Sequence, residues 1–139
     1  MNKEQLLTQI YIKHPVFGDL SREAEDSFTH YNHSAALACL FVLLEGSLKY
    51  SLDYDETDKL SLSTAINKCY QTKKISVEEK ELLHQIRRIR NSLFHDDPYS
   101  IAIVIDGLIY QYSETETKEL LYEKYSPVVF GICARILQS

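Results

Sequence analysis

Apolar residues recur three and four positions apart along most of the chain, which is the spacing of one face of an α-helix. The stretch from Ser34 to Leu44 carries no charged residue, so we expect it to be the buried centre of its helix. The pattern predicts five helices: Asn2–Lys13, Ser21 to about Leu52, Asp58 to about Thr72, Val77–Phe94 and Thr115–Gln138.

Capping and helix-breaking residues mark several of the predicted boundaries. Asn2 is a favourable N-cap for the first helix. Ser76, followed three residues later by Glu79, forms a capping box that opens the fourth helix. Pro98 ends that helix, because the residue before a proline is disfavoured in helical geometry. Pro127 predicts an interruption or kink in the last helix.

Residues 99–112 have a different pattern, rich in β-branched and aromatic side chains and divided by Asp106-Gly107. A two-residue Asp-Gly connection between such runs is a strong signal for a β-hairpin. A buried helix would also explain the apolar run, and we prefer the hairpin. The sequence therefore predicts an all-α protein, an up-and-down bundle of four to five helices with a small β-hairpin near residues 100–112, in one domain over residues 1–139.

Charge and cysteine content limit the classes of function. The net charge is -5, so the chain lacks the overall basic character of most nucleic-acid-binding proteins, and any RNA contact must use a local patch. Three cysteines without a CxxC pair favour a reducing compartment. The N-terminus does not resemble a signal peptide, and the longest strongly apolar run is too short to span a bilayer. We therefore expect a cytoplasmic protein without membrane contact.

The fourth predicted helix carries an unusual cation. At about 100° per residue, Arg90 falls within the apolar arc that should face the core. A buried charge is costly without a partner, so Arg90 requires a carboxylate, a phosphate or a position at an assembly seam. Glu45, directly after the apolar stretch, is the best candidate for a structural ion pair. His95 follows at the helix end and shares a face with Asn91.

The stretch LLHQIRRIRNSLFHD, with Arg90 and His95 separated by four residues, resembles the HEPN superfamily of helical nucleotide- and RNA-handling domains. The order of helices from about Glu23 to His95 is also similar to that family. Members with an intact motif are commonly metal-independent endoribonucleases, and the motif helices of two protomers face each other. The resemblance implies a homodimer whose Arg/His sets form one composite site.

The resemblance also implies roles for individual residues. His95 would act as general acid or base, Arg90 would clamp the phosphate, and Asn91 would orient His95 or the phosphate. Substrate would also contact Arg87, Arg88 and Ser92. No metal or cofactor is expected, because the chemistry needs none and no Gly-rich phosphate loop is present.

Three hypotheses remain open from the sequence. The first is a ribonuclease of a toxin or phage-defence kind, with RNA as substrate and an antitoxin or regulatory protein as a further partner. Some members of the family carry a Tyr two residues after the His, where a partner nucleotidyltransferase modifies it; here that position is Asp97. The second hypothesis is a non-catalytic HEPN module that dimerises and binds RNA, nucleotide or protein. The third is a purely structural helical oligomer.

Overall fold

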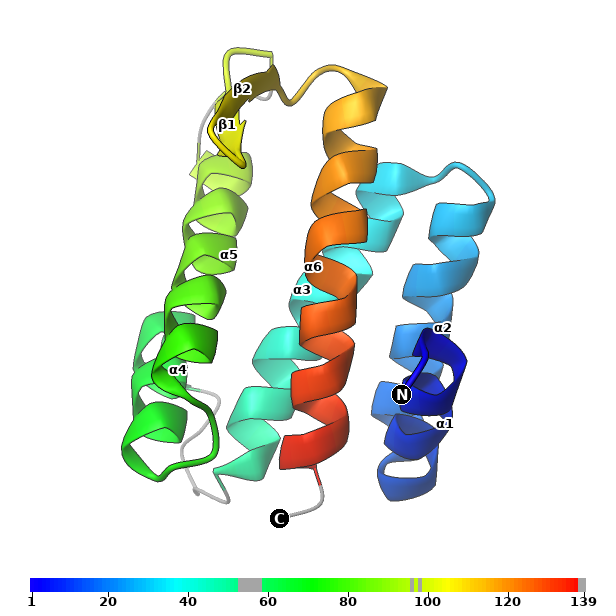
Figure 1. Ribbon diagram of the computed structural model, residues 1–139, viewed down its shortest axis with the longest axis vertical. Helices are drawn as coiled ribbons and strands as arrows, with labels where there is room; N and C mark the ends of the chain where they lie inside the picture. Colours follow the sequence, from blue (N-terminus) through cyan, green and yellow to red (C-terminus); the bar gives the residue numbers. More distant parts are fainter. Residues whose placement is uncertain (53–58, 96, 98, 138–139) are drawn as a thin grey trace.

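Six helices and one β-hairpin make up the part of the chain that the structure describes (Figure 1). This structure is a computed structural model, and it describes residues 1–52, 59–95, 97 and 99–137, without the side chains of Phe94 and His95. The all-helical prediction is confirmed, with six helices in place of four to five. In chain order the elements are α1 (Lys3–Lys13), α2 (Pro15–Thr29), α3 (His33–Ser51), α4 (Leu62–Gln71), α5 (Val77–His95), β1 (Ala102–Ile105), β2 (Leu108–Gln111) and α6 (Thr115–Ile136).

The central helix is α3, as its uncharged stretch predicts. It packs against α2 on one side and α6 on another, and α1 covers both α2 and α6 (Figure 1). On the opposite side α4 contacts α3, and α5 packs chiefly on α4. By length and composition α3 is also apolar enough to cross a membrane, and half of that span is buried inside the protein. Burial between α2 and α6 accounts for its apolar composition.

The single long helix predicted from Ser21 to Leu52 is wrong, because the chain turns between α2 and α3. Tyr31 adopts a positive φ of 65°, and its N–H donates to the carbonyl of Phe28. The N–H of Asn32 donates to the carbonyl of Ser27 at 2.8 Å. These two bonds form a Schellman motif, a common helix ending whose left-handed residue is usually glycine. A tyrosine in that position gave no signal in the sequence.

The predicted break after α1 is also shorter than expected. Only His14 separates α1 from α2, because Pro15 stands at the first position of α2, where its missing N–H costs nothing. The His14 ring accepts a hydrogen bond from the Phe17 N–H and caps the helix. The next turn packs tightly on α1, since a Cβ on Gly18 would lie 2.4 Å from the Tyr11 Cα.

One other helix boundary and one predicted interruption differ from the structure. The third predicted helix is α4, and it begins at Leu62 rather than near Asp58, because the Ser61 hydroxyl accepts a hydrogen bond from the Thr64 N–H and caps it. Asp58 lies outside the described residues. The last helix, α6, continues through Pro127 without interruption. The predicted end at Gln138 lies outside the described residues.

The hairpin between α5 and α6 is confirmed. Strands β1 and β2 pair antiparallel, from Ala102 opposite Gln111 to Ile105 opposite Leu108. Asp106 and Gly107 have φ values of 51° and 83°, as a two-residue type I′ turn requires. One face of β1 is buried, and the hairpin covers the ends of α5 and α6 that lie at the top of Figure 1.

Candidate nucleic-acid interface

The helix α5 carries every site residue predicted from the sequence except Glu45. Its start is fixed by the predicted capping box: the Glu79 N–H donates to the Ser76 hydroxyl, and the Ser76 N–H donates to the Glu79 carboxylate. Leu83 and Ile86 are buried and fix the rotation of the helix about its axis. The polar residues of α5 are therefore distributed over its remaining surface.

Arg90 and Glu45 form the structural ion pair expected from the sequence. Arg90 Nη1 lies 3.3 Å from Glu45 Oε1, and the two side chains retain 23% and 31% of their exposure. Lys49, one turn further along α3, places its Nζ 3.9 Å from the other Glu45 oxygen. Arg90 is thus partly buried and held against α3, and it is not enclosed in the core.

Arg87 lies on a different side of α5, toward α4. Its Nε donates to His84 Nδ1 at 3.0 Å, and His84 Nε2 lies 2.9 Å from Asn67 Oδ1 on α4. Burial, together with the neighbouring charges of Arg87, Arg88 and Lys80, lowers the pKa of His84 below its ordinary value. Neither His84 nor Asn67 was predicted from the sequence. The His84–Arg87 spacing of three residues was visible, whereas the partner on α4 required the tertiary structure.

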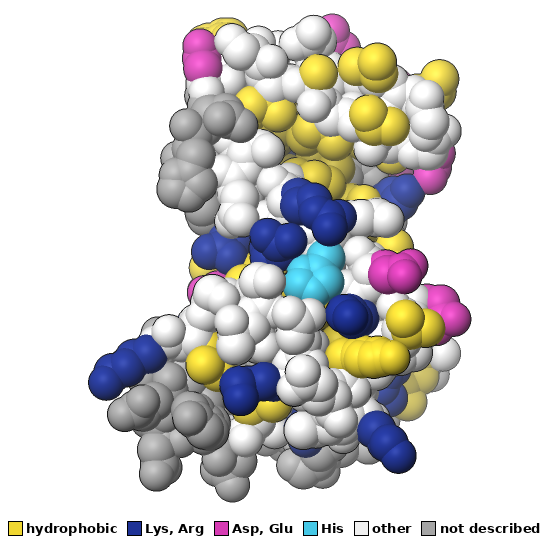
Figure 2. All heavy atoms as spheres, turned by 90° about the vertical axis from the view of Figure 1, so that its left-hand side faces the viewer, with side chains coloured by type: hydrophobic (Ala, Val, Ile, Leu, Met, Phe, Trp, Pro, Cys, Tyr) yellow, Lys and Arg dark blue, Asp and Glu magenta, His cyan; other side chains and the backbone are white. Residues whose placement is uncertain are grey.

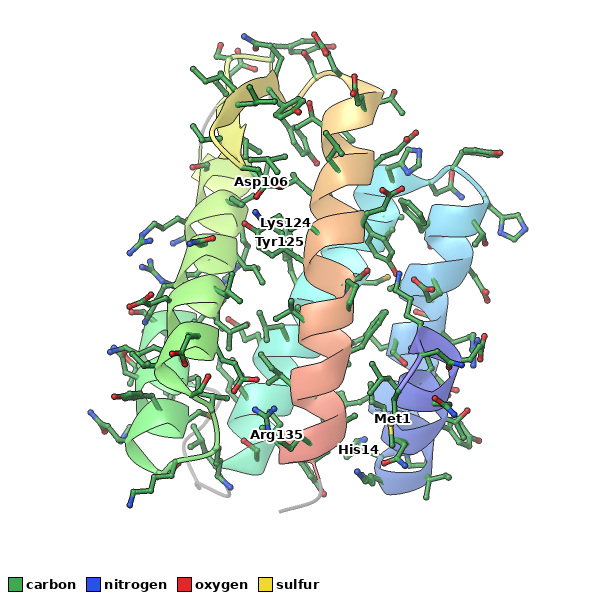
Figure 3. The ribbon with its side chains drawn as sticks, in the orientation of Figure 1. Met1, His14, Asp106, Lys124, Tyr125 and Arg135 are labelled. Carbon is green, nitrogen blue, oxygen red and sulfur yellow. The ribbon has the colours of Figure 1, made fainter. Side chains whose placement is uncertain are left out.

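Arg88 and Ser92 lie one turn apart and line a groove of about 250 Å³ between α5, β1 and α6. Ile89 and Tyr125 contribute apolar walls to this groove. Tyr125 extends from α6 into the space between the two helices (Figure 3), where its hydroxyl donates to Gln85 Oε1 at 3.3 Å. The predicted substrate-binding residues are therefore divided between two sides of α5, with Arg87 toward α4 and Arg88 toward the hairpin.

The two remaining predicted residues are Asn91 and His95. Asn91 is half-buried on α5. His95 is the last residue of α5, and its side chain lies outside the described residues, as does Asp96 beside it. Asp97 is exposed, and its carboxylate accepts a hydrogen bond from the Tyr99 N–H at 3.0 Å.

The face of the molecule that carries α4 and α5 concentrates positive charge despite the acidic composition. Figure 2 shows Lys and Arg side chains gathered around a histidine where this face is hollowed, with few acidic side chains beside them. Positive charge collected at a concave surface attracts phosphate groups. In the residues that the structure describes, no group of three or more His, Cys, Asp or Glu side chains is placed to hold a metal ion.

Comparison of the chain with known protein families, with curated proteins and with solved structures finds no match. Fold and site together define a small helical-bundle protein with a cationic face on α5. The HEPN resemblance of the Arg90–His95 segment stays a prediction from the sequence.

Proposed function

We propose that this protein is a HEPN-type, metal-independent endoribonuclease of the toxin or phage-defence kind, acting in the cytoplasm as a homodimer. The observation that carries the proposal is the group of three arginines, Arg87, Arg88 and Arg90, on the turns of α5 that precede His95, with Arg90 fixed in place 3.3 Å from Glu45. Arginine offers a fixed fork of donors that matches a phosphate group, and α5 supplies several such groups beside the His95 position.

In this proposal His95 takes the proton of the ribose 2′-hydroxyl as that oxygen attacks the phosphorus atom. The bond from phosphorus to the 5′-oxygen breaks, and the leaving oxygen receives a proton from the second His95 of the dimer. The products carry a 2′,3′-cyclic phosphate and a free 5′-hydroxyl. Arg90 stabilises the negative charge that develops on the phosphorane, and Asn91 positions His95 or the phosphate.

Dimerisation in this proposal uses the open side of α5. One face of α5 is buried within the subunit, and its exposed face is available to a second subunit. Two copies of α5 facing each other bring two further arginines, Arg87 of each subunit, to one cleft, and Arg88 of each subunit lies at its edge toward the hairpin. An antitoxin or regulatory protein would cover the same cleft. In some members of the family a nucleotidyltransferase partner modifies a tyrosine two residues after the His, and here Asp97 occupies that position.

The alternative is a non-catalytic HEPN module that binds RNA, nucleotide or protein. The Arg90–Glu45 pair favours it, because a carboxylate already compensates the cation that a transition state would require. The net charge of -5 also favours the non-catalytic module.

The test is incubation of mixed RNA with the purified protein in excess chelator, comparing wild type with His95→Ala and Arg90→Ala. Replacement of His30, which is exposed at the end of α2, is the matched histidine control. Cleavage by wild type and His30→Ala alone supports the nuclease. Binding without cleavage by any variant supports the non-catalytic module, and a strictly monomeric solution mass overturns the composite site.

A further inference from the structure

The arginines of this chain divide into two groups by their partners. Arg87 and Arg88 make no ion pair with any residue that the structure describes. Each of the others is paired with a carboxylate: Arg22 with Glu4 at 2.6 Å, Arg90 with Glu45 at 3.3 Å and Arg135 with Glu79 at 2.7 Å. Arg87 nevertheless has a fixed direction, because its only hydrogen bond within the described residues joins Nε to a histidine.

The contacts of His84 determine which of its ring nitrogens carries the proton. Arginine is always a donor, so Nδ1 of His84 accepts the Arg87 Nε–H and is unprotonated. Nε2 therefore carries the hydrogen and donates it to Asn67 Oδ1 at 2.9 Å. His84 is thus neutral, and it joins a side chain of α4 to a guanidinium on α5.

The surroundings of His84 are positive. The charged groups that influence its titration are Arg87, Arg88 and Lys80, and all three are cations. Lys80 extends over the ring of Tyr70, with its Nζ 4.6 Å from the ring centroid. Four-residue spacing places Lys80 and Arg88 one turn before and after His84 on the same face of α5. An anion at this face meets several donors with no carboxylate among these groups.

We propose that Asn67, His84 and Arg87 form a relay that holds the Arg87 guanidinium ready to bind a phosphate of single-stranded RNA beside the one bound by Arg90. The inference rests on the proposed function, because it takes RNA as the ligand. With Nε engaged by His84, the two Nη groups of Arg87 have no partner among the described residues and present a pair of parallel donors. His84 and Asn67 are positioning residues, and Arg87 is the group that contacts the phosphate.

Preorganisation is the reason for a neutral histidine at this place. A free arginine loses rotamer freedom when it binds, and a side chain already fixed avoids part of that loss. A carboxylate would fix Arg87 equally well, but it would cancel the charge and repel the phosphate. Imidazole supplies an acceptor without negative charge, so the guanidinium keeps its full attraction for RNA.

The experiment is a double-mutant cycle on RNA binding, measured by fluorescence anisotropy with a short labelled single-stranded RNA. The variants are Arg87→Gln, His84→Ala, the double variant and Asn67→Ala, with Arg22→Gln as the matched arginine control on the far side of the fold. We expect Arg87→Gln to weaken binding about tenfold, as for loss of a charged hydrogen bond. His84→Ala should weaken RNA binding about fivefold because Arg87 loses its fixed position, although this substitution removes no charge above neutral pH.

Two readouts separate positioning from simple charge or stability effects. The slope of log Kd against log salt should fall by about 0.7 for Arg87→Gln, as for one lost phosphate contact, and stay unchanged for His84→Ala. In the Arg87→Gln background, His84→Ala should have no further effect. Asn67→Ala should weaken binding in the same direction as His84→Ala. Thermal unfolding of each variant identifies any change that comes from misfolding.

The relay is overturned if wild type binds RNA and the two substitutions are additive, or if His84→Ala binds as well as wild type. That result leaves the nuclease proposal intact, since it concerns His95 and Arg90. If the His84 and Arg87 substitutions weaken RNA binding non-additively and wild type does not cleave RNA, the relay is supported and the nuclease proposal fails. Absence of RNA binding by wild type overturns both. Binding of a nucleoside monophosphate that equals that of RNA identifies a free nucleotide, rather than an RNA chain, as the ligand.

Discussion

The strength of the Arg90–Glu45 pair follows from its distance and its exposure. The charged atoms lie 3.3 Å apart, and the side chains keep 23% and 31% of their exposure. Fully exposed pairs contribute about 0 to 1 kcal/mol, whereas breaking a fully buried pair costs about 3 to 5 kcal/mol. The intermediate burial leads us to expect a coupling energy of about 1 to 2 kcal/mol at moderate salt.

A double-mutant cycle measures that coupling. Glu45→Gln, Arg90→Gln and the double variant are unfolded in urea, and the coupling is the difference between the double effect and the sum of the single effects. The control is the same cycle on Glu45 and Lys49, a longer pair of 3.9 Å between residues four apart on one helix, where we expect about 0.3 to 0.5 kcal/mol. A coupling for Arg90 no larger than that for Lys49 would refute the view that Glu45 is what holds Arg90 on α3.

Two further predictions concern stability. Because the pKa of His84 is lowered in the fold, the unfolded state binds the proton first as the pH falls. The contribution of His84 to stability is therefore complete above its ordinary pKa of 6.5 and decreases below it. The difference in free energy of unfolding between wild type and His84→Gln, measured in urea, should therefore become smaller as the pH falls. A difference that becomes larger would contradict the neutral relay. Gly18→Ala should lower the free energy of unfolding by about 2 kcal/mol or more, because the added Cβ would lie 2.4 Å from the Tyr11 Cα and overpack the α1–α2 contact. Gly131→Ala, in open space on α6, should instead stabilise by up to about 1 kcal/mol, and equal effects of the two glycine substitutions would show that the tight α1–α2 contact is absent.

Local signals determined how much of the fold the sequence could predict. The capping box at Ser76 and the Asp106-Gly107 turn depend on residues a few positions apart, and both are present in the structure. The break between α2 and α3 was missed because Tyr31 occupies a left-handed position that glycine usually fills. Such an ending depends on packing around the turn, which a single sequence does not reveal.

The candidate site shows the same division. A helical wheel indicated that Arg90 lies near the core and needs a carboxylate, a phosphate or a position at an assembly seam, and Glu45 supplies the carboxylate. The wheel separates Arg87 from Arg88 by about 100°, but it did not show that Arg87 would face α4 and Arg88 the groove beside β1. The contact between Asn67 and His84 could not be predicted from the sequence either, because Asn67 lies on another helix and contacts α5 only after folding.

The central claim is that Arg90 and His95 from two subunits act on one RNA phosphate. The most direct measurement mixes two inactive variants, Arg90→Ala and His95→Ala, and follows cleavage of RNA in excess chelator. A composite site predicts that the mixture regains part of the wild-type activity. Mixed dimers contain one intact Arg90 and one intact His95 on opposite subunits, and water protonates the leaving oxygen in place of the second His95. Cleavage that stays at the level of each variant alone, in a mixture shown by mass to contain mixed dimers, would contradict the claim.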